Sequence, residues 1–181
     1  VRRNLNVVYI VMNNGCYVWT KGQDSATGDV GSVSKNGINS FNASDLPALA
    51  LELGATFVAR SFSGDRTQLI PLIKAAVSHH GFALIDVISP CVTFNNNTGS
   101  TKSYDYVREH ITTADVVDYV PPGEEITMEY AEGSSAELTL HDGSMLQLHK
   151  LAPNWDPRDK LAAMQRIYLS RAKQEILTGL L

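Results

Sequence analysis

The sequence has few cysteines and no long apolar run. Cys16 and Cys91 are the only two cysteines in 181 residues, and their spacing favours neither a disulfide nor the Cys-x-x-Cys pair of a zinc site. No apolar run approaches the roughly 20 residues that cross a bilayer. The first residues, 1–4, lack the apolar region of a secretory signal. We therefore expect a cytoplasmic protein without a membrane-spanning segment.

An excess of charge of one sign is also missing. The 15 basic and 19 acidic residues give a formal net charge of −4, and the sequence pI is 5.7. The basic residues are scattered and form no stripe, which argues against a nucleic-acid-binding protein. With 44% hydrophobic residues, the chain suits one soluble globular domain with a sizeable core.

The stretch of residues 12–23 lies where an apolar strand gives way to a loop. The run of residues 5–12 is rich in β-branched residues and short enough for a buried strand of a parallel sheet. In open α/β sheets, ligands bind at the carboxyl ends of such strands. The amide oxygen of Asn14 and the backbone carbonyls after it could offer ligands to Mg²⁺, with a carboxylate and phosphate oxygens completing the octahedron. Taken alone, the residues are more typical of a plain turn, because Asn and Gly tolerate positive φ.

Apolar runs and helical periods alternate along the first half of the chain. We expect helices over residues 45–53, capped by Ser44 or Asn42, and from Asp65 to Gly81. Short strands are expected over residues 55–60 and 82–88. This β-α-β-α-β order predicts an α/β fold with a parallel sheet in three Rossmann-like layers.

The pattern changes after about residue 120, so we expect residues 1–120 to form the main domain and residues 121–181 an extension. A short helix is expected over residues 101–110. The extension should begin with strands, at residues 126–130, 136–140 and 145–150, the last two joined by the hairpin signal Asp142-Gly143. A terminal helix is expected from about Pro157 to Leu177, with Ile176 and Leu177 on its apolar side.

Four segments of the chain share one resemblance. They are Asn13-Asn14-x-x-Tyr17-x-x-Thr20-Lys21-Gly22-Gln23, Ser89-Pro90-Cys91-Val92-Thr93-Phe94-Asn95, Tyr104-Asp105-Tyr106-Val107 and Leu140-His141-Asp142-Gly143-Ser144. The first resembles the second half of the thiamine-diphosphate motif in the β subunit of 2-oxoacid:ferredoxin oxidoreductases, particularly the 2-oxoglutarate type. The others resemble further segments of that subunit, in the same order. The resemblance covers most of the chain and implies a thiamine-diphosphate-binding fold.

The resemblance also implies roles for the residues after the first strand. Asn13, Asn14, Gly15 and Tyr17 would bind the diphosphate end of thiamine diphosphate. The Mg²⁺ that holds the diphosphate would be bound by the side chain of Asn14 and the backbone carbonyl of Cys16. In the family, a Gly-Asp-Gly segment with the Mg²⁺-binding aspartate precedes this motif, and a cysteine-rich segment precedes that. Because this chain contains neither, we expect it to be the carboxyl-terminal portion of the subunit.

Trp19, Thr20 and Lys21 correspond to substrate-side positions of the family. Lys21 could offer a cation to a carboxylate of the 2-oxoacid, although a solvated surface position is the commonest fate of a lysine. Trp19 departs from the family, in which a smaller residue is usual, so the pocket size and the choice of substrate stay open.

Cys91 matches the family position that gives the fourth thiolate to a [4Fe–4S] cluster, a group that soft thiolate ligands suit. The other three ligands would lie outside this chain. Without the resemblance, Cys16 and Cys91 would both be interpreted as small buried residues.

The function implied by the resemblance is the oxidative decarboxylation of 2-oxoglutarate, or a related 2-oxoacid, to an acyl-CoA and CO₂. Its partners would be the α subunit of the same enzyme, ferredoxin, coenzyme A and the 2-oxoacid. Two alternatives stay open: a cluster-free thiamine-diphosphate decarboxylase or synthase, and a non-catalytic assembly module.

The remaining polar residues are weaker candidates for function. Residues 22–32 have no strand or helix period, and next to a cofactor site we expect such a loop to act as a lid or a partner contact. Asp24 and Asp29 within it are expected to be solvated. His79 and His80 end a helix, where a cation favours the helix dipole, so we expect a structural role rather than a metal site.

Overall fold

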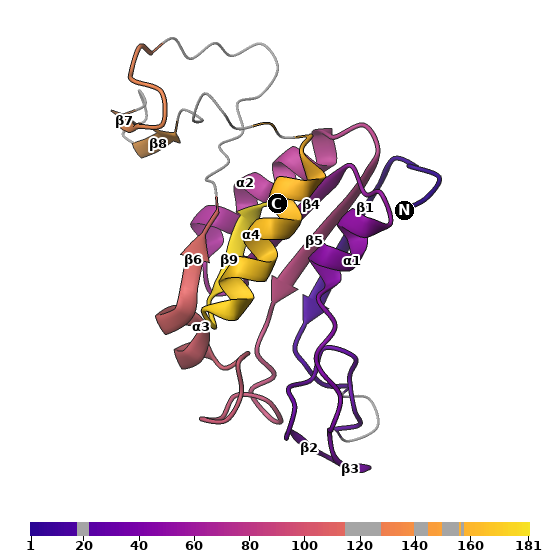
Figure 1. The fold of residues 1–181 in the computed structure, drawn as a ribbon. Helices are drawn as coiled ribbons and strands as arrows, with labels where there is room; N and C mark the ends of the chain where they lie inside the picture. Colours follow the sequence, from indigo (N-terminus) through magenta and orange to yellow (C-terminus); the bar gives the residue numbers. More distant parts are fainter. Residues whose placement is uncertain (18–21, 115–127, 140–144, 150–155, 157) are drawn as a thin grey trace.

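A computed structural model describes residues 1–17, 22–114, 128–139, 145–149, 156 and 158–181. Its main body is a sheet of five strands in the order β1-β5-β4-β9-β6, with helices on both faces (Figure 1). The strands are β1 (Val7–Asn13), β4 (Phe57–Phe62), β5 (Phe82–Ile88), β6 (Ile111–Thr113) and β9 (Ile176–Leu180). The α/β fold in three layers is confirmed.

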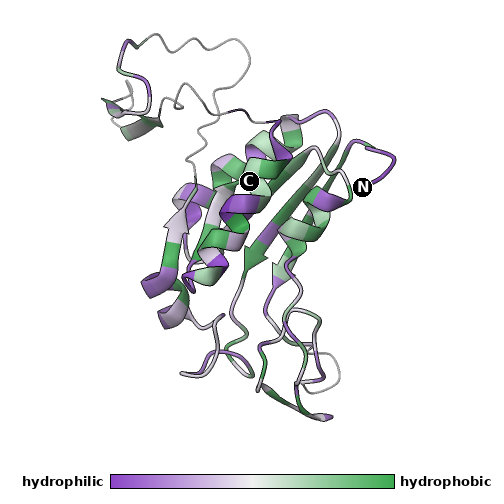
Figure 2. Cartoon of the chain, viewed as in Figure 1, coloured by the Kyte–Doolittle hydropathy of each residue, from purple (hydrophilic) through white to green (hydrophobic). Residues whose placement is uncertain are grey.

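Two apolar cores fill the space between the layers. Helices α1 (Leu46–Glu52) and α4 (Lys160–Ala172) pack on one face, where Val58 and Leu84 meet Ile167. Helix α2 (Arg66–Ser78) covers the other face, where Ala59 and Ile85 meet Leu72. Successive strand residues point to opposite faces, so nearly every residue of β5 is apolar, and Figure 2 shows hydrophobic colours through much of β4 and β5.

Strands β1, β5 and β4 run parallel, as their sequence pattern predicts. In the register, Asn13 lies opposite Ile88 and Phe62 lies opposite the same residue. All three strands therefore end at the same edge of the sheet, and the loops that follow them meet there.

The first strand is less buried than expected. Within the described sheet β1 stands first in the order and pairs only with β5, and Tyr9 and Met12 are 57% and 62% exposed. The prediction of a fully buried strand is wrong because the second side of β1 has no neighbouring strand among the described residues.

The end of the chain differs from the predicted terminal helix. Helix α4 ends at Ala172, and Gln174 takes a positive φ of 60°. Ile176 and Leu177, which were expected on the helix, lie in β9, antiparallel to β4 and parallel to β6. A short apolar run fits a buried strand as well as a helix. Here the run forms a strand because it can pair with both β4 and β6. Although it follows residue 121, β9 thus joins the central sheet.

The smaller elements agree with the sequence pattern in part. Asp45, rather than Ser44 or Asn42, caps α1, and Asp65 caps α2, which ends three residues before Gly81. Helix α3 spans Tyr104–His110, shorter than the expected 101–110. The loop after β1 carries a two-residue ladder of β2 (Val33–Ser34) and β3 (Gly37–Ile38).

The expected hairpin is present as β7 (Ser135–Thr139) paired antiparallel with β8 (Met145–His149). Its turn, with Asp142-Gly143, lies outside the described residues. Of the expected strand 126–130, residues 126 and 127 also lie outside them, and residues 128–130 form no strand. Among the described residues, no helix combines the length and apolar character needed to cross a membrane.

Candidate functional site

The ends of β1 and β5 bring two of the predicted motif segments together. The backbone N–H of Ser89 donates to the carbonyl of Asn13 over 2.9 Å, so the parallel pairing continues past the strand ends. Asn14 and Cys91 therefore follow neighbouring strands at one edge of the sheet. This is the edge at which the sequence predicts a cofactor site.

Asn14 shapes the turn that leaves β1. Its side-chain oxygen accepts a hydrogen bond from the backbone N–H of Cys16 at 3.0 Å, and Gly15 takes a positive φ of 66°, a conformation that suits glycine. The side-chain amide of Asn95, itself only 6% exposed, donates to the Asn14 carbonyl over 2.8 Å. The two motif segments are thus joined directly by a partly buried hydrogen bond.

The turn of residues 91–95 is held by its own backbone. The N–H groups of Phe94 and Asn95 both donate to the carbonyl of Cys91, at 3.3 and 2.8 Å. This places the Cys91 side chain at the start of a tight turn beside the Asn14 turn. The two predicted cofactor segments form one contiguous surface.

Gly15 lies in a crowded place. A Cβ atom there would come within 2.7 Å of Cδ of Lys102 and still closer to the side-chain amide of Asn95. A Cβ at Gly28 would likewise lie 3.2 Å from the carbonyl oxygen of Gly15. Side chains therefore lie close to Gly15, and these contacts together with its positive φ favour glycine at this position.

Asn13 carries a buried polar atom that has no hydrogen-bond partner in the described part of the chain. The residue is 8% exposed, and its side-chain oxygen accepts nothing. A buried acceptor left unpaired is costly, and such exceptions concentrate at sites where a ligand completes the set. The amide oxygens of Asn13 and Asn14 fit a hard cation or the donor groups of a polar ligand.

A cavity of about 190 Å³ opens beside this turn. Three segments line it: residues 15 and 16 after β1, residues 22–25, 32–35 and 39 of the following loop, and residues 94 and 95 after β5. Gln23 pairs back to Tyr17 through two backbone hydrogen bonds of 3.1 and 3.2 Å. The loop thus folds over the end of β1 and forms one wall of the cavity.

The two thiols influence each other and have different surroundings. Partial burial, together with the neighbouring Cys91 sulfur, raises the pKa of Cys16 to about 11. Partial burial also opposes a thiolate at Cys91, but hydrogen bonds from backbone amides of the turn and from Cys16 outweigh it and lower the pKa of Cys91. Cys91 is therefore the better thiolate ligand of the two.

Cys91 would have to share a cluster with ligands from elsewhere. Among the described residues, no group of three or more His, Cys, Asp or Glu side chains could hold a metal ion. One half-buried cysteine at the edge of the sheet fits one ligand position of a thiolate-bound cluster. It does not make a metal site by itself.

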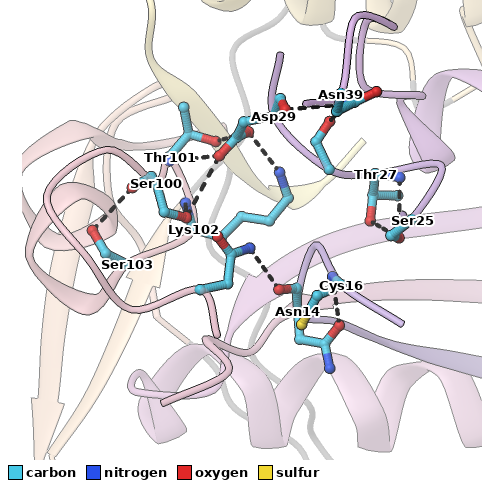
Figure 3. Close-up of polar contacts among 12 residues, drawn as sticks. Asn14, Cys16, Ser25, Thr27, Asp29, Asn39, Ser100, Thr101, Lys102 and Ser103 are labelled. Atoms are coloured by element: carbon cyan, nitrogen blue, oxygen red, sulfur yellow. Dashed lines mark hydrogen bonds and ion pairs between the residues drawn. The ribbon is translucent and has the colours of Figure 1, made fainter. Parts of the chain in front are cut away.

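The sequence prediction that Asp29 is solvated is wrong. Its carboxylate lies 3.1 Å from the ammonium of Lys102 and accepts hydrogen bonds from the backbone N–H and the hydroxyl of Thr101, at 2.9 and 2.6 Å (Figure 3). Burial raises the pKa of Asp29, but the Lys102 charge and the Thr101 hydrogen bonds outweigh it, and the pKa lies below its usual range. No local pattern marks this contact, because its partners are more than seventy positions apart in the sequence.

The remaining predicted residues fall into two groups. Trp19, Thr20 and Lys21 lie outside the described residues. The side chain of Tyr17 is 55% exposed, and its role in binding a cofactor stays a prediction. Asp24 is exposed as expected.

Neither helix-end histidine has the surroundings of a metal ligand in the described part of the chain. His79 lies at the C-terminus of α2, where its ring nitrogen makes a 2.8 Å hydrogen bond with Thr56. His80 follows it and is exposed. A structural role fits both.

Comparison with known proteins places this geometry in a family. Residues 1–87 match the family described as "Thiamine pyrophosphate enzyme, C-terminal TPP binding domain". A 2-oxoacid:ferredoxin oxidoreductase β subunit of a Sulfolobus species is 34% identical over 183 residues, covering 97% of this chain and 59% of that protein. The corresponding subunit of Saccharolobus solfataricus is 46% identical over 101 residues, covering 52% of this chain and 32% of that protein.

A solved structure agrees with these relatives. The 2-oxoglutarate:ferredoxin oxidoreductase of Magnetococcus marinus, bound to 2-oxoglutarate, coenzyme A and succinyl-CoA, matches with a TM-score of 0.69 and 27% identity, covering 99% of this chain and 48% of that chain. This chain thus spans about half the length, or less, of the proteins that it resembles. The conserved fold, the matched residues and the edge where the two motif segments meet lead to one conclusion: the chain belongs to the family of 2-oxoacid:ferredoxin oxidoreductase β subunits and carries a thiamine-pyrophosphate-binding domain.

Proposed function

We propose that the cavity at the carboxyl ends of β1 and β5 receives the diphosphate end of thiamine diphosphate with its Mg²⁺. The observation that carries the proposal is the direct hydrogen bond from Asn95 to the carbonyl of Asn14, which unites both motif segments beside the cavity. The side-chain oxygen of Asn14 and the backbone carbonyl of Cys16 would then be Mg²⁺ ligands. Asn13, Gly15 and Tyr17 would contact the cofactor.

The geometry of this chain suits that role in three respects. Neutral amide and carbonyl oxygens suit a hard cation whose remaining ligands are phosphate oxygens. Gly15 lets backbone approach closely at the turn. The unpaired oxygen of Asn13 offers an acceptor for a polar group of the cofactor.

The activity that we infer for the complete enzyme is the oxidative decarboxylation of a 2-oxoacid, of the 2-oxoglutarate type. Bound thiamine diphosphate would supply the electron sink for this chemistry. Coenzyme A would accept the acyl group and ferredoxin the electrons, while an α subunit would complete the enzyme. Trp19, Thr20 and Lys21 would contact the 2-oxoacid. Of the predicted extension of residues 121–181, the hairpin of β7 and β8 would stand outside the main domain of residues 1–120, because α4 and β9 pack with its sheet.

Cys91 would contribute one ligand to a [4Fe–4S] cluster, and its lowered pKa favours the thiolate that such a cluster needs. In the assembled enzyme, we expect a brown colour and a visible absorption band that Cys91→Ser removes while the protein remains folded. An unchanged band in the variant would favour the cluster-free decarboxylase instead.

Calorimetric titration of the chain with thiamine diphosphate and Mg²⁺ tests the cofactor site. We expect saturable binding that requires both, and Asn14→Ala should weaken it by about tenfold or more, the usual effect of removing a group at a metal site. Asn42→Ala, an exposed position on the same loop, is the control and should bind like the wild type. If the wild-type chain binds no cofactor, the assembly-module alternative replaces this proposal.

A further inference from the structure

The ion pair between Asp29 and Lys102 is the most enclosed charge contact near the cavity. The two side chains are only 15% and 10% exposed and lie 3.1 Å apart. Asp29 also accepts the two Thr101 hydrogen bonds described above. Both charges are thus largely removed from water, where losing one partner costs more than at a surface.

The pair joins two segments that each line or support the cavity. Asp29 belongs to the loop of residues 22–44, and the side-chain amide of Asn39 donates to the carbonyls of Gly28 and Asp29, at 3.2 and 3.0 Å. Lys102 precedes Ser103, the cap of α3. Figure 3 shows Asp29 between these two segments, with Lys102 reaching toward it.

The stem of Lys102 also touches the cofactor turn. A Cβ atom on Gly15 would come within 2.7 Å of its Cδ. Lys102 therefore contacts the turn through its methylene groups and the loop through its ammonium. One side chain connects the turn after β1, the loop of residues 22–44 and the start of α3.

We propose that Asp29 and Lys102 are positioning residues that hold the loop of residues 22–44 closed against Gly15 and so keep the cavity in the shape that receives the diphosphate end of the cofactor. The role toward the cofactor rests on the proposed function. The role toward the loop does not, because every contact that carries it lies within the chain. Neither residue needs to touch the substrate.

Hydrogen exchange measured by mass spectrometry on the cofactor-free chain tests the hold on the loop. Asp29→Asn and Lys102→Met should each speed the exchange of residues 22–44 by about tenfold or more, the effect expected when a buried charge loses its partner. Lys102→Met keeps a long stem against Gly15 and removes only the charge, and Lys102→Arg should restore slow exchange. Unchanged exchange in the loop would overturn the proposal.

Asp65→Asn is the matched control. Asp65 accepts hydrogen bonds from the Gln68 N–H and the Thr67 hydroxyl, at 3.1 and 2.7 Å, much as Asp29 does from Thr101, but it caps α2 and does not belong to the loop of residues 22–44. Its loss should leave exchange of residues 22–44 unchanged. If the Asp29 and Lys102 variants speed exchange equally in β4 and β5, the pair is merely structural and the proposal fails.

Cofactor titration separates this inference from the proposed function. Asp29→Asn and Lys102→Met should raise the apparent Kd for thiamine diphosphate with Mg²⁺ by about tenfold. Their unfolding midpoints should stay close to that of Asp65→Asn. Lys102→Arg should recover most of the affinity. Unaltered affinity in both variants would overturn the role toward the cofactor. No binding by the wild type would overturn the proposed function, while the exchange experiment would still decide whether the pair holds the loop.

Discussion

At the scale of single residues, the two cysteines show how small differences in surroundings separate chemical roles. Partial burial raises the pKa of Cys16, together with the neighbouring Cys91, whereas at Cys91 the hydrogen bonds from backbone amides and from Cys16 outweigh burial and lower the pKa. Amides and a thiol donor stabilise a thiolate, and burial destabilises one. The chain therefore offers two thiols at the same edge of the sheet, of which Cys91 ionises more readily than Cys16.

Alkylation should reveal this difference. In the cluster-free chain at about pH 8, iodoacetamide should modify Cys91 at least about tenfold faster than Cys16, because the thiolate is the nucleophile. Peptide mass spectrometry over a time course measures both rates. Equal rates, or faster modification of Cys16, would contradict the assignment of the two environments.

The contrast between Asn14 and Asp29 shows what the sequence reveals about single residues. The position of Asn14 in a turn after a strand was predictable, because the strand end, the turn residues and the family motif coincide there. Its role toward a cofactor stays a prediction. Asp29 was not, because its partners Thr101 and Lys102 come close only through the fold. A carboxylate in a glycine-containing loop is usually solvated, and no local pattern marks the exception.

At the scale of elements, a buried charge network ties helix α1 to the sheet. Arg60 in β4 lies 2.9 Å from Asp86 in β5 and 2.9 Å from Asp45, the cap of α1. Burial opposes the charge of Arg60, but Asp86 and Asp45 outweigh it and raise the pKa of Arg60 further. The network fixes the helix that follows the 22–44 loop against the strands that end at the site.

Arg60→Met should therefore destabilise the fold strongly. The variant leaves Asp86 as an uncompensated charge: its side chain is fully buried, and one of its oxygens already lacks a hydrogen-bond partner within the described part of the chain. We expect a loss of about 3–5 kcal/mol in the free energy of unfolding, measured by urea denaturation. Adding Asp86→Asn should recover part of it, and a loss below about 1 kcal/mol in the single variant would show that the network is not buried in solution.

The parallel strands and their helices were predictable, and β9 was not. Strands β4 and β5 and helices α1 and α2 occur in the predicted order, and Asp65 caps α2 as predicted, although Asp45 caps α1 in place of Ser44 or Asn42. The residues of β9 continue the apolar pattern of α4. The helix ends at Ala172, and the residue with positive φ just after it is Gln174 rather than a glycine, so the usual stop signal is missing. The residues of β9 join the sheet because they pair with β4 and β6, which is a tertiary contact that the local sequence does not reveal.

At the scale of the whole molecule, the loops of one sheet edge are held together by charges as well as by the apolar cores. Because the pKa of Asp29 is lowered in the folded chain, the unfolded chain binds a proton at higher pH than the folded chain. The contribution of Asp29 to stability is therefore complete above its unfolded pKa of about 3.9 and is lost as the pH falls through the folded value.

Acid denaturation should show this contribution. The free energy of unfolding of the wild type should exceed that of Asp29→Asn at pH 7, and the gap should shrink as the pH falls below about 4. Urea titrations over a pH series measure the gap, with Asp65→Asn as the comparison variant. A gap of equal size at pH 3 and pH 7 would mean that Asp29 is not held as a carboxylate in the folded protein.

The most direct test of the account asks whether a metal bound with thiamine diphosphate sits at the Asn14 turn. Mn²⁺ prefers oxygen ligands, as Mg²⁺ does, and its unpaired electrons broaden nearby NMR signals. In the chain labelled with ¹⁵N-asparagine, Mn²⁺ with thiamine diphosphate should broaden the side-chain amide signals of Asn13, Asn14 and Asn95. The signal of Asn4 should stay sharp, because Asn4 bonds to Phe82 at the opposite end of the strands, roughly 20 Å away at about 3.3 Å per residue. Sharp signals for Asn14 and Asn95 under saturating cofactor would contradict the central claim.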